Sequence, residues 1–531
     1  MKEGGCLGQY AQQALKLVFA FVDMVVHWIF RRMYGGAHTD LPPIEDLILL
    51  DSATTLAFKI RTQKLTSEQV LESFIERIKV ANPILNAVVA DRFEEARKEA
   101  RAADKLIKSG EIPPETLEKD KPFLGVPFTT KDCIPIKGLI HSSGLVRRKH
   151  RIAEEDAKVV AALRLAGAIP IGLTNISELC MWWESSNNVH GRCNNPYDCT
   201  RTVGGSSGGE GCAQAAALSA FGIGSDIGGS IRMPSFFNGV FGHKPSPFAV
   251  PNHGQYPQPI TTEQATFLGL GPMCRRAEDL VPIFKVIVDK VYLEQLRLDE
   301  KVDIKNIKFY LQEGDTKAFL VSPVDQEIRE LFGKISLHLN KAHGIKATKV
   351  SLTKFGESAP LWFANMKAPT GPTFQDQLAN LEGTINPYLE FLKWTIGKSQ
   401  HTFIALATAI ADKVGCKYGD AKHQSLVQLR NELKRELLDL IGDDGVFVYP
   451  THPTAAPHHN EPLFKPFNFS YTGIINVLGM PATHCPMGLN KDGVPIGVQV
   501  VAKPNNDRLC LAVARELEKA FGGWVPPHTD V

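Results

Sequence analysis

Two glycine- and serine-rich stretches constrain this chain more than any other feature. The first is Gly204-Gly205-Ser206-Ser207-Gly208-Gly209, and the second is Ser225-Asp226-Ile227-Gly228-Gly229-Ser230-Ile231-Arg232. Glycine lets backbone N–H groups approach an anion or an oxyanion closely, because no Cβ is in the way. A flexible linker has a similar composition, but linkers do not alternate with Ile, Met, Pro and Phe as residues 227–237 do. We therefore expect both stretches to belong to a folded site.

Composition indicates a large globular enzyme. The 531 residues are 44% hydrophobic and 22% charged, which suits a folded body with a sizeable core. Lys and Arg number 59 against 57 Asp and Glu, and no block of like charges occurs, so no nucleic-acid partner is expected. The ten cysteines contain no CxxC pair, and we predict that most are free thiols.

An apolar segment from Leu15 to Phe30 is the part of the chain best suited to lipid. As a helix it would reach only about 24 Å, under the ~30 Å hydrocarbon core. Asp23 near its centre costs about 2.5–3.5 kcal/mol on insertion scales. Extending the helix back, to residues 11–32, repairs the length.

On that longer helix the polar residues Gln12, Lys16, Asp23 and His27 form one stripe. Such a helix either spans the bilayer with its stripe against a partner or lies in the interface with its stripe to water. A cleaved signal peptide is a third alternative. We predict a single-pass anchor at residues 1–33 and a Gly/Pro-marked linker at 34–43. The charges of Arg31 and Arg32 favour a cytosolic body on an intracellular membrane.

Helical and strand patterns alternate after the linker. A capping box, Thr66-x-x-Gln69, opens an amphipathic helix that runs to Lys79. Short apolar runs with turn-forming flanks predict strands, and amphipathic patterns between them predict helices. The clearest strands are at 124–128, 168–173, 446–449 and 496–501, and the clearest helices are at 156–165 and 506–520. We predict an α/β sheet covered by helices, in one domain from 44 to 531.

The first Gly/Ser stretch also fits the G-x-S-x-G pattern of a nucleophile elbow, with His243, His452 and His484 as candidate bases. An elbow needs a strand directly before it, and residues 198–203 make a poor strand. A phosphate cradle is excluded because no G-x-x-x-x-G-K-[ST] motif occurs. His452, His458 and His459 lack metal-ligand spacing, so no metal is expected.

The two stretches, together with Gly125-Val126-Pro127-Phe128-Thr129-Thr130-Lys131-Asp132 and Gly172-Leu173-Thr174-Asn175, resemble the signature of the amidase signature hydrolases. The resemblance returns at 445–450 and 476–482. It implies a central twisted mixed β-sheet covered by α-helices, and it implies no cofactor. Met233 before Pro234 is a small departure from the family pattern.

The resemblance implies a Ser-Ser-Lys triad: Ser230 as nucleophile, Ser206 as proton relay after a cis Gly205–Ser206 peptide, and Lys131 as base. A lysine serves as base only if its surroundings lower its pKa, and Lys131 follows an apolar run where burial is plausible. Backbone N–H groups of Ile227, Gly228, Gly229 and Ser230 would form the oxyanion hole. Ser207, Asp226 and Arg232 are candidates for supporting these loops.

Three features favour a lipid amide as the substrate. The N-terminal helix would hold the site beside a bilayer. Cys180, Met181 and Trp183 follow the Gly172 stretch, where the family lines its acyl pocket, although core packing also explains them; Cys133 and Cys180 are read most simply as small buried hydrophobes. Residues 388–414 predict two short apolar helices edged by lysines, which suits a membrane-facing cap, with an ordinary buried helix pair as the alternative.

The whole chain thus resembles the membrane-anchored branch of the family that cleaves fatty-acid amides. The expected partners are a lipid amide, such as oleamide or anandamide, and membrane lipid; a homodimer is also considered. Three alternatives stay open. They are an amidase of small soluble amides or a transamidation subunit, a non-catalytic membrane protein on this fold, and the Ser-His-Asp hydrolase described above.

Overall fold

A mixed β-sheet is the centre of the protein. The structure is a computed structural model that describes residues 4–35, 41–314 and 320–527. Within these ranges eleven strands form the sheet. In spatial order they are β1 (Val88–Asp91), β3 (Ile169–Thr174), β2 (Pro127–Lys131), β6 (Phe221–Asp226), β8 (Gly269–Cys274), β7 (Phe241–Lys244), β12 (Ala482–Leu489), β13 (Pro495–Val501), β11 (Gly445–Pro450), β9 (Lys308–Leu311) and β10 (Thr348–Lys349). A separate two-stranded ribbon joins β4 (Ser186–Asn187) to β5 (Gly191–Arg192).

The sheet combines parallel and antiparallel pairs. β2 runs parallel to both of its neighbours, β3 and β6, and β9 runs parallel to β10 and β11. The remaining pairs are antiparallel. The predicted mixed α/β sheet is therefore confirmed.

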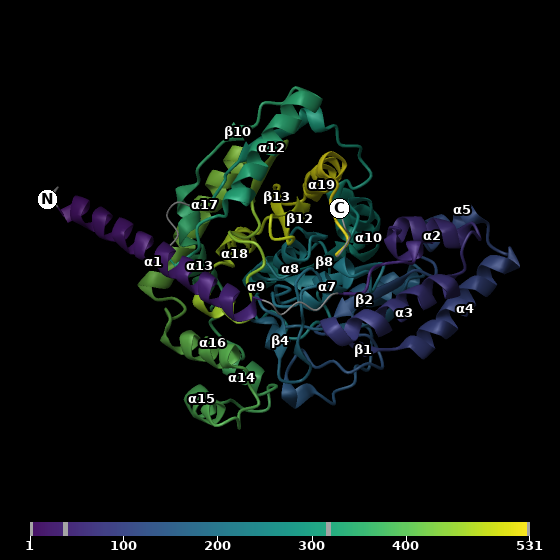
Figure 1. Cartoon of the computed structure of the whole chain (residues 1–531), viewed down its shortest axis with the longest axis horizontal. Coiled ribbons are helices and arrows are strands. Elements are labelled where there is room, and N and C mark those ends of the chain that lie inside the picture. The colour runs from purple at the N-terminus through teal and green to yellow at the C-terminus, as the bar shows by residue number, and fades with distance from the viewer. Residues whose placement is uncertain (1–3, 36–40, 315–319, 528–531) are drawn as a thin grey trace.

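Helices cover this sheet (Figure 1). In chain order they are α1 (Gly4–Tyr34), α2 (Ala53–Arg61), α3 (Ser67–Leu85), α4 (Phe93–Ser109), α5 (Pro114–Asp120), α6 (Lys158–Leu165), α7 (Gly208–Ala215), α8 (Arg232–Phe237), α9 (Thr262–Phe267), α10 (Leu280–Ile287), α11 (Lys290–Leu296), α12 (Gln326–His343), α13 (Ser358–Asn365), α14 (Phe374–Leu378), α15 (Pro387–Thr395), α16 (Phe403–Val414), α17 (Ala421–Ile441), α18 (Ser470–Val477) and α19 (Asp507–Phe521). α7 and α8 pack against each other over the central strands, and α6, α10 and α19 form a second group on the sheet.

Most of the predicted elements lie where the sequence placed them. The capping box is present at the start of α3, where the Thr66 hydroxyl accepts from Gln69 N and the Gln69 side chain accepts from Thr66 N. The strand predicted at 124–128 begins later, at Pro127. A turn occupies the earlier residues, because Val126 N donates to Phe123 O. As a consequence Lys131 is the last residue of a buried strand.

The segment before the active-site loops is packed too tightly for larger side chains. On β6, a Cβ at Gly222 would come within 1.8 Å of Glu210 Oε2 on α7. Glu210 is fully buried and accepts from the hydroxyls of Thr129 and Thr174, each at 2.9 Å. Burial raises the pKa of Glu210 to about 8, although the bonds from Thr129, Thr174 and Gln214 oppose the rise. The small residues of β6 thus allow α7 to lie directly on the strand.

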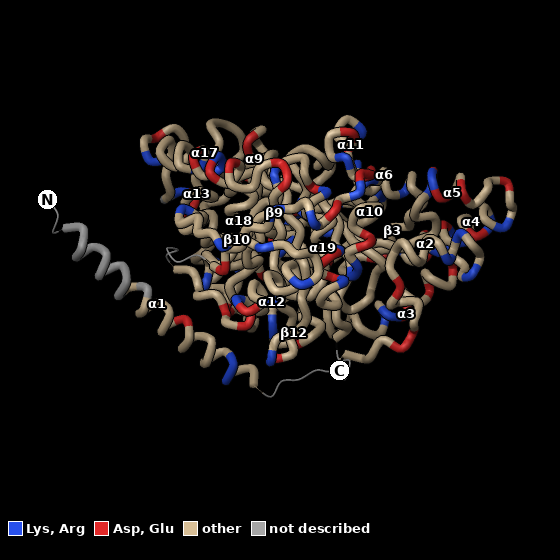
Figure 2. Tube along the Cα trace, turned by 90° about the horizontal axis from the view of Figure 1, so that it is seen from above, with Lys and Arg blue, Asp and Glu red and all other residues tan. Residues whose placement is uncertain are grey.

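The N-terminal segment is helical as predicted, but the structure gives no support for the prediction that it spans a membrane. Among the described residues, none of the helices has the length and apolar character needed to cross a bilayer. Asp23 Oδ1 instead lies 3.0 Å from Lys465 Nζ, and His27 Nδ1 lies 3.0 Å from Glu461 Oε1. These contacts hold α1 on the outside of the body, where Figures 1 and 2 show it. Two polar residues that hydrocarbon would penalise are thus paired with the protein.

The structure describes only part of the N-terminal segment for which the polar stripe and the linker were predicted. The side chains of Gln12 and Lys16 lie outside the described residues, as do linker positions 36–40. On the described part of α1, the face away from the body is apolar and exposed. It comprises Leu15, Leu17, Val18, Phe21, Val22, Met24, Trp28, Ile29 and Met33.

Candidate active site

Lys131 is the centre of a buried polar cluster between the two Gly/Ser stretches. Its Nζ lies 2.7 Å from Ser206 Oγ, 3.0 Å from Ser225 Oγ and 3.3 Å from Ser225 O. Lys131 and Ser206 are both fully buried. The ammonium or amine group therefore joins the end of β2 to both stretches. Ser225 was not singled out from the sequence, although it stands directly before Asp226.

The two stretches are also joined directly. Ser207 N donates to Ser230 O at 3.2 Å, and the Ser207 hydroxyl donates to Ser225 O at 3.2 Å. The Gly205–Ser206 peptide is cis, as the family resemblance implied. The structure thus places Lys131 against the Ser206 hydroxyl and joins Ser207 to the Ser230 backbone, and the roles assigned to these residues stay a prediction.

The backbone of the second stretch is shaped by Asp226. Its Oδ1 accepts from Gly229 N at 2.7 Å, and its Oδ2 accepts from Ile231 N at 3.1 Å. One of the four expected oxyanion donors, Gly229 N–H, is therefore already bonded. In the described part of the chain the N–H groups of Ile227, Gly228 and Ser230 donate no hydrogen bond. These three remain as candidate donors to a developing oxyanion.

Gly229 needs to be glycine for two reasons. Its φ is +121°, a backbone conformation that residues with a Cβ rarely adopt. A Cβ there would also meet Thr472 Oγ1 at 1.9 Å. Thr472 in turn donates to Gly228 O at 2.8 Å, so α18 fixes the stretch from outside. Trp362 of α13 adds a second support, because its Nε1 donates to Ile227 O at 2.9 Å.

Arg232 and Asp226 form a fully buried ion pair behind the second stretch. Arg232 Nε lies 3.0 Å from Asp226 Oδ2. Burial raises the pKa of Asp226, but Arg232 outweighs it and holds that pKa down at about 2. Arg232 also donates to Gln499 Oε1 on β13 and to Asn476 Oδ1 on α18. The sequence marked Asp226 and Arg232 as candidates for supporting the second stretch, but it did not reveal the partners at 476 and 499, because nothing local marks them.

A cavity of about 820 Å³ adjoins the second stretch. Its lining includes Ile227, Cys180 and Met181 on one side, Trp362 and Phe363 of α13 on another, and Thr408 and Ala411 of α16. The volume is within the ~300–1,000 Å³ range of small-molecule sites. Cys180 and Met181 thus lie where the sequence predicted a substrate pocket. The hydrogen bond with Cys133 and the nearby Lys131 outweigh burial and lower the pKa of the Cys180 thiol to about 7.

Trp183 does not line this cavity, which corrects the prediction for that residue. It is buried in the core, where its ring lies 5.2 Å from the His452 ring and 6.3 Å from the Phe237 ring. The indole Nε1 donates to Pro466 O. The sequence could not separate the two roles because adjacent residues in a loop point in different directions.

The histidines considered as bases all have partners away from the serines. His243 contacts Thr483 and Asp507, His484 contacts Thr451, and His452 contacts Thr454 O. Residues 198–203 before the first stretch form no strand of the sheet. Both features argue against a Ser-His-Asp hydrolase. His458 and His459, also examined for metal binding, contact Thr200 and Glu184 instead.

Comparison with known proteins agrees with these features. The human protein named Fatty-acid amide hydrolase 2 is 49% identical over 490 residues, which cover 91% of this chain and 92% of that protein. Fatty-acid amide hydrolase 2-B of Danio rerio is 42% identical over 531 residues and 99% of both chains. A solved structure described as Fatty acid amide hydrolase superimposes with a TM-score of 0.71 at 22% identity, over 91% of this chain and 87% of that one.

A family model described as Amidase matches residues 69–511, a range that holds both Gly/Ser stretches, Lys131 and the Arg232 network. This confirms the resemblance seen in the signature motifs. Because that match and the alignment to the human relative each extend over most of the sequence, the protein belongs to the amidase signature family.

Proposed function

We propose that this protein is a serine hydrolase that cleaves fatty-acid amides to a fatty acid and an amine or ammonia. The observation that carries the proposal is the buried Lys131–Ser206 contact, at 2.7 Å, beside a cavity that Ile227 links to the Ser230 loop. The names of the human and Danio rerio relatives point to the same substrate class.

In the proposed mechanism Ser230 is the nucleophile. Its Oγ attacks the amide carbonyl carbon while its proton passes to Ser206 and the Ser206 proton passes to neutral Lys131. The carbonyl oxygen becomes an oxyanion, which accepts hydrogen bonds from the free N–H groups of Ile227, Gly228 and Ser230. The C–N bond then breaks, the proton returns through Ser206 to the leaving nitrogen, and water hydrolyses the Ser230 ester. Support for this assignment comes from Lys131, which contacts both stretches.

The cavity favours a long apolar acyl group over a small amide. Its walls include Ile227, Met181, Trp362 and Phe363, which offer apolar surface along the approach to the Ser230 loop. Burying apolar substrate against such walls contributes about 25 cal/mol per Å². A short amide would leave most of this volume filled with water. Oleamide and anandamide are suitable probes of this substrate class.

We also propose that the protein lies on a membrane surface rather than spanning it. α16 lines the cavity through Thr408 and Ala411, while its buried residues Ala405, Leu406 and Ala409 pack on the body. Leu392 on α15, which packs against α16, and Ile396 directly after α15 are exposed by 63% each. Apolar residues in contact with lipid next to the cavity wall would admit an amide directly from the bilayer.

The exposed face of α1 extends the same argument. With Asp23 and His27 turned to the body, Phe21 and Trp28 on the other side are exposed by 61% and 62%. This arrangement differs from the interfacial alternative of the sequence analysis, because Asp23 and His27 face the body and not water, but it leaves an apolar face free to lie in the interface. Such a helix gains free energy by burying its apolar face between lipid headgroups.

Hydrolysis of oleamide and of a short-chain primary amide by detergent-solubilised protein tests the proposed function. We expect a strong preference for oleamide and its loss in Ser230→Ala. Preference for the short amide would reject the fatty-amide assignment and leave the triad. Undiminished activity of Ser230→Ala would reject the mechanism. Ser73→Ala, which removes an exposed hydroxyl on α3, serves as a control.

A further inference from the structure

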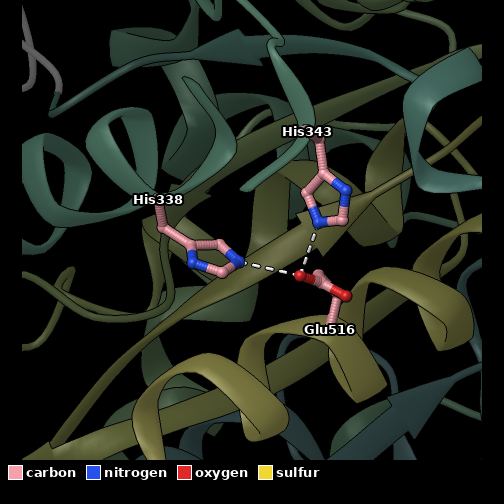
Figure 3. Close-up of side chains that lie close together, drawn as sticks. All are labelled: His338, His343 and Glu516. Carbon is pink, nitrogen blue, oxygen red and sulfur yellow. Dashed lines mark hydrogen bonds and ion pairs between the residues drawn. The ribbon is translucent and has the colours of Figure 1, made fainter. Parts of the chain in front are cut away.

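Three side chains with metal-binding atoms converge between α12 and α19 (Figure 3). His338 and His343 come from α12, and Glu516 comes from α19. Each histidine Nε2 lies 2.7 Å from Glu516 Oε1, and the three potential ligand atoms lie within 4.8 Å of one another. None of these residues belongs to the active-site cluster or lines its cavity.

We propose that His338, His343 and Glu516 form a binding site for a divalent transition-metal ion, with Zn²⁺ as the preferred occupant. Two imidazoles and one carboxylate are a ligand set that proteins use for zinc, with a fourth position left to water. Bonds of about 2.0–2.2 Å to a tetrahedral ion separate its ligand atoms by about 3.3 Å. The two present contacts, each 2.7 Å, would therefore lengthen by about 0.6 Å.

The surroundings suit an ion that enters from water. The side chains of His338, His343 and Glu516 are 23%, 19% and 13% exposed, so the cluster is partly dehydrated but still in contact with solvent. Burial raises the pKa of Glu516, but the hydrogen bonds from His343 and His338 outweigh it and lower that pKa. One metal ion would replace the two histidine contacts on the same oxygen.

Packing also orients the rings in advance. The His338 ring lies 5.6 Å from the Phe521 ring, edge to face, and the two imidazoles meet at 82° with centroids 5.8 Å apart. Neither imidazole is stacked on the other, and Figure 3 shows both pointing toward Glu516. Held ligands lose less conformational entropy on binding, which favours affinity.

A bound ion would connect two elements that are distant in sequence. α12 packs on β13, and α19 packs on β12 and β13. Coordination from both helices would stabilise this part of the folded protein without contact with the triad. Local sequence could not reveal the site, because the third ligand lies more than 170 residues after the second.

The test is Zn²⁺ titration of the full-length protein after dialysis against EDTA, followed by calorimetry and by thermal unfolding. We expect one Zn²⁺ per chain with a Kd below about 10 µM, and a rise in Tm with added Zn²⁺. His338→Ala, His343→Ala and Glu516→Gln should each lower the affinity at least tenfold. His150→Ala, at an exposed histidine outside the cluster, should bind as the wild type does.

Co²⁺ supplies an independent readout, since its visible ligand-field bands report direct histidine coordination. A Kd for Zn²⁺ above about 100 µM in the wild type would overturn the proposal. So would unchanged affinity in Glu516→Gln, which is isosteric and should fold even if an alanine variant does not. In either case the cluster is a carboxylate hydrogen-bonded to two histidines and nothing more.

Discussion

The catalytic loops and the α15–α16 pair are built in opposite ways. Around Ser206 and Ser230 the polar side chains are buried, and glycines allow backbones to approach closely. Leu389 and Leu392 on α15 and Ile396 directly after it face solvent, although burial of such apolar side chains is the usual source of stability. In the catalytic loops the interactions fix the geometry of the site. The α15–α16 pair leaves unburied apolar area, which is typical of a surface that meets another phase.

The largest expected effect comes from removing the amine side chain that joins the catalytic loops. Lys131→Ala should lower kcat/KM for oleamide about 10³-fold, because the proposed proton acceptor is lost. Steady-state kinetics on folded protein measures this. Lys137→Ala, at an exposed lysine a few residues on, should change kcat/KM less than twofold. Equal loss in both variants would show that charge near β2 matters, and not a base at Lys131.

The second test breaks the ion pair behind the loops. Arg232→Ala leaves Asp226 buried without its partner and should lower the free energy of unfolding by about 3–5 kcal/mol. Chemical denaturation monitored by circular dichroism gives this value. Arg435→Ala, at an exposed arginine of α17, should cost under about 0.5 kcal/mol. A small effect at Arg232 would mean that the loop geometry does not depend on the network.

The third test uses pH. Asp226 has a folded pKa of about 2 against 3.8 when unperturbed, so its stabilisation is present above about pH 4 and is lost as the pH falls toward 2. We expect about 2 kcal/mol of unfolding free energy to disappear over this window. Asp226→Asn should be less stable at pH 7 but lose less on acidification. Parallel pH curves for the two proteins would contradict the assignment.

The smallest expected effect concerns the α15–α16 pair and its exposed apolar residues. Leu392→Ser with Ile396→Ser should weaken binding to phosphatidylcholine vesicles about tenfold and leave the free energy of unfolding unchanged, since both side chains are exposed. Vesicle sedimentation and denaturation measure the two quantities. Leu165→Ser, at a residue 75% exposed on α6, is the matched control and should bind vesicles normally. Equal loss in the control would place lipid contact elsewhere.

The contrast between the regions also explains what sequence could predict. Lys131, Ser206 and Ser230 were identifiable because each lies inside a dense local motif. Thr472, Asn476 and Gln499 support the same loops from far along the chain, and single polar residues in apolar surroundings give no such signal. The pattern of apolar residues along the sequence predicted the helices of the α15–α16 pair and α1.

What periodicity could not predict is the direction in which a polar stripe faces. The pattern of the polar stripe on α1 is the same whether the stripe faces a partner within a bilayer or the body of the protein itself. Only tertiary contacts of Asp23 and His27 with Lys465 and Glu461 distinguish the two. Trp183 illustrates the same limit on a smaller scale, since its core position depends on His452 and Pro466.

The hydrogen bonds from Arg232 to residues far along the chain have a consequence for the synthesis of the enzyme. All three proposed triad residues are synthesised by position 230, but apart from Asp226 the acceptors of the Arg232 hydrogen bonds belong to Thr472, Asn476 and Gln499. During translation the nascent chain therefore carries its full reactive set long before it can hold that set in place. We expect hydrolysis to begin only after residue 499 has left the ribosome. A chain truncated before that residue should therefore be inactive, and not an unselective hydrolase.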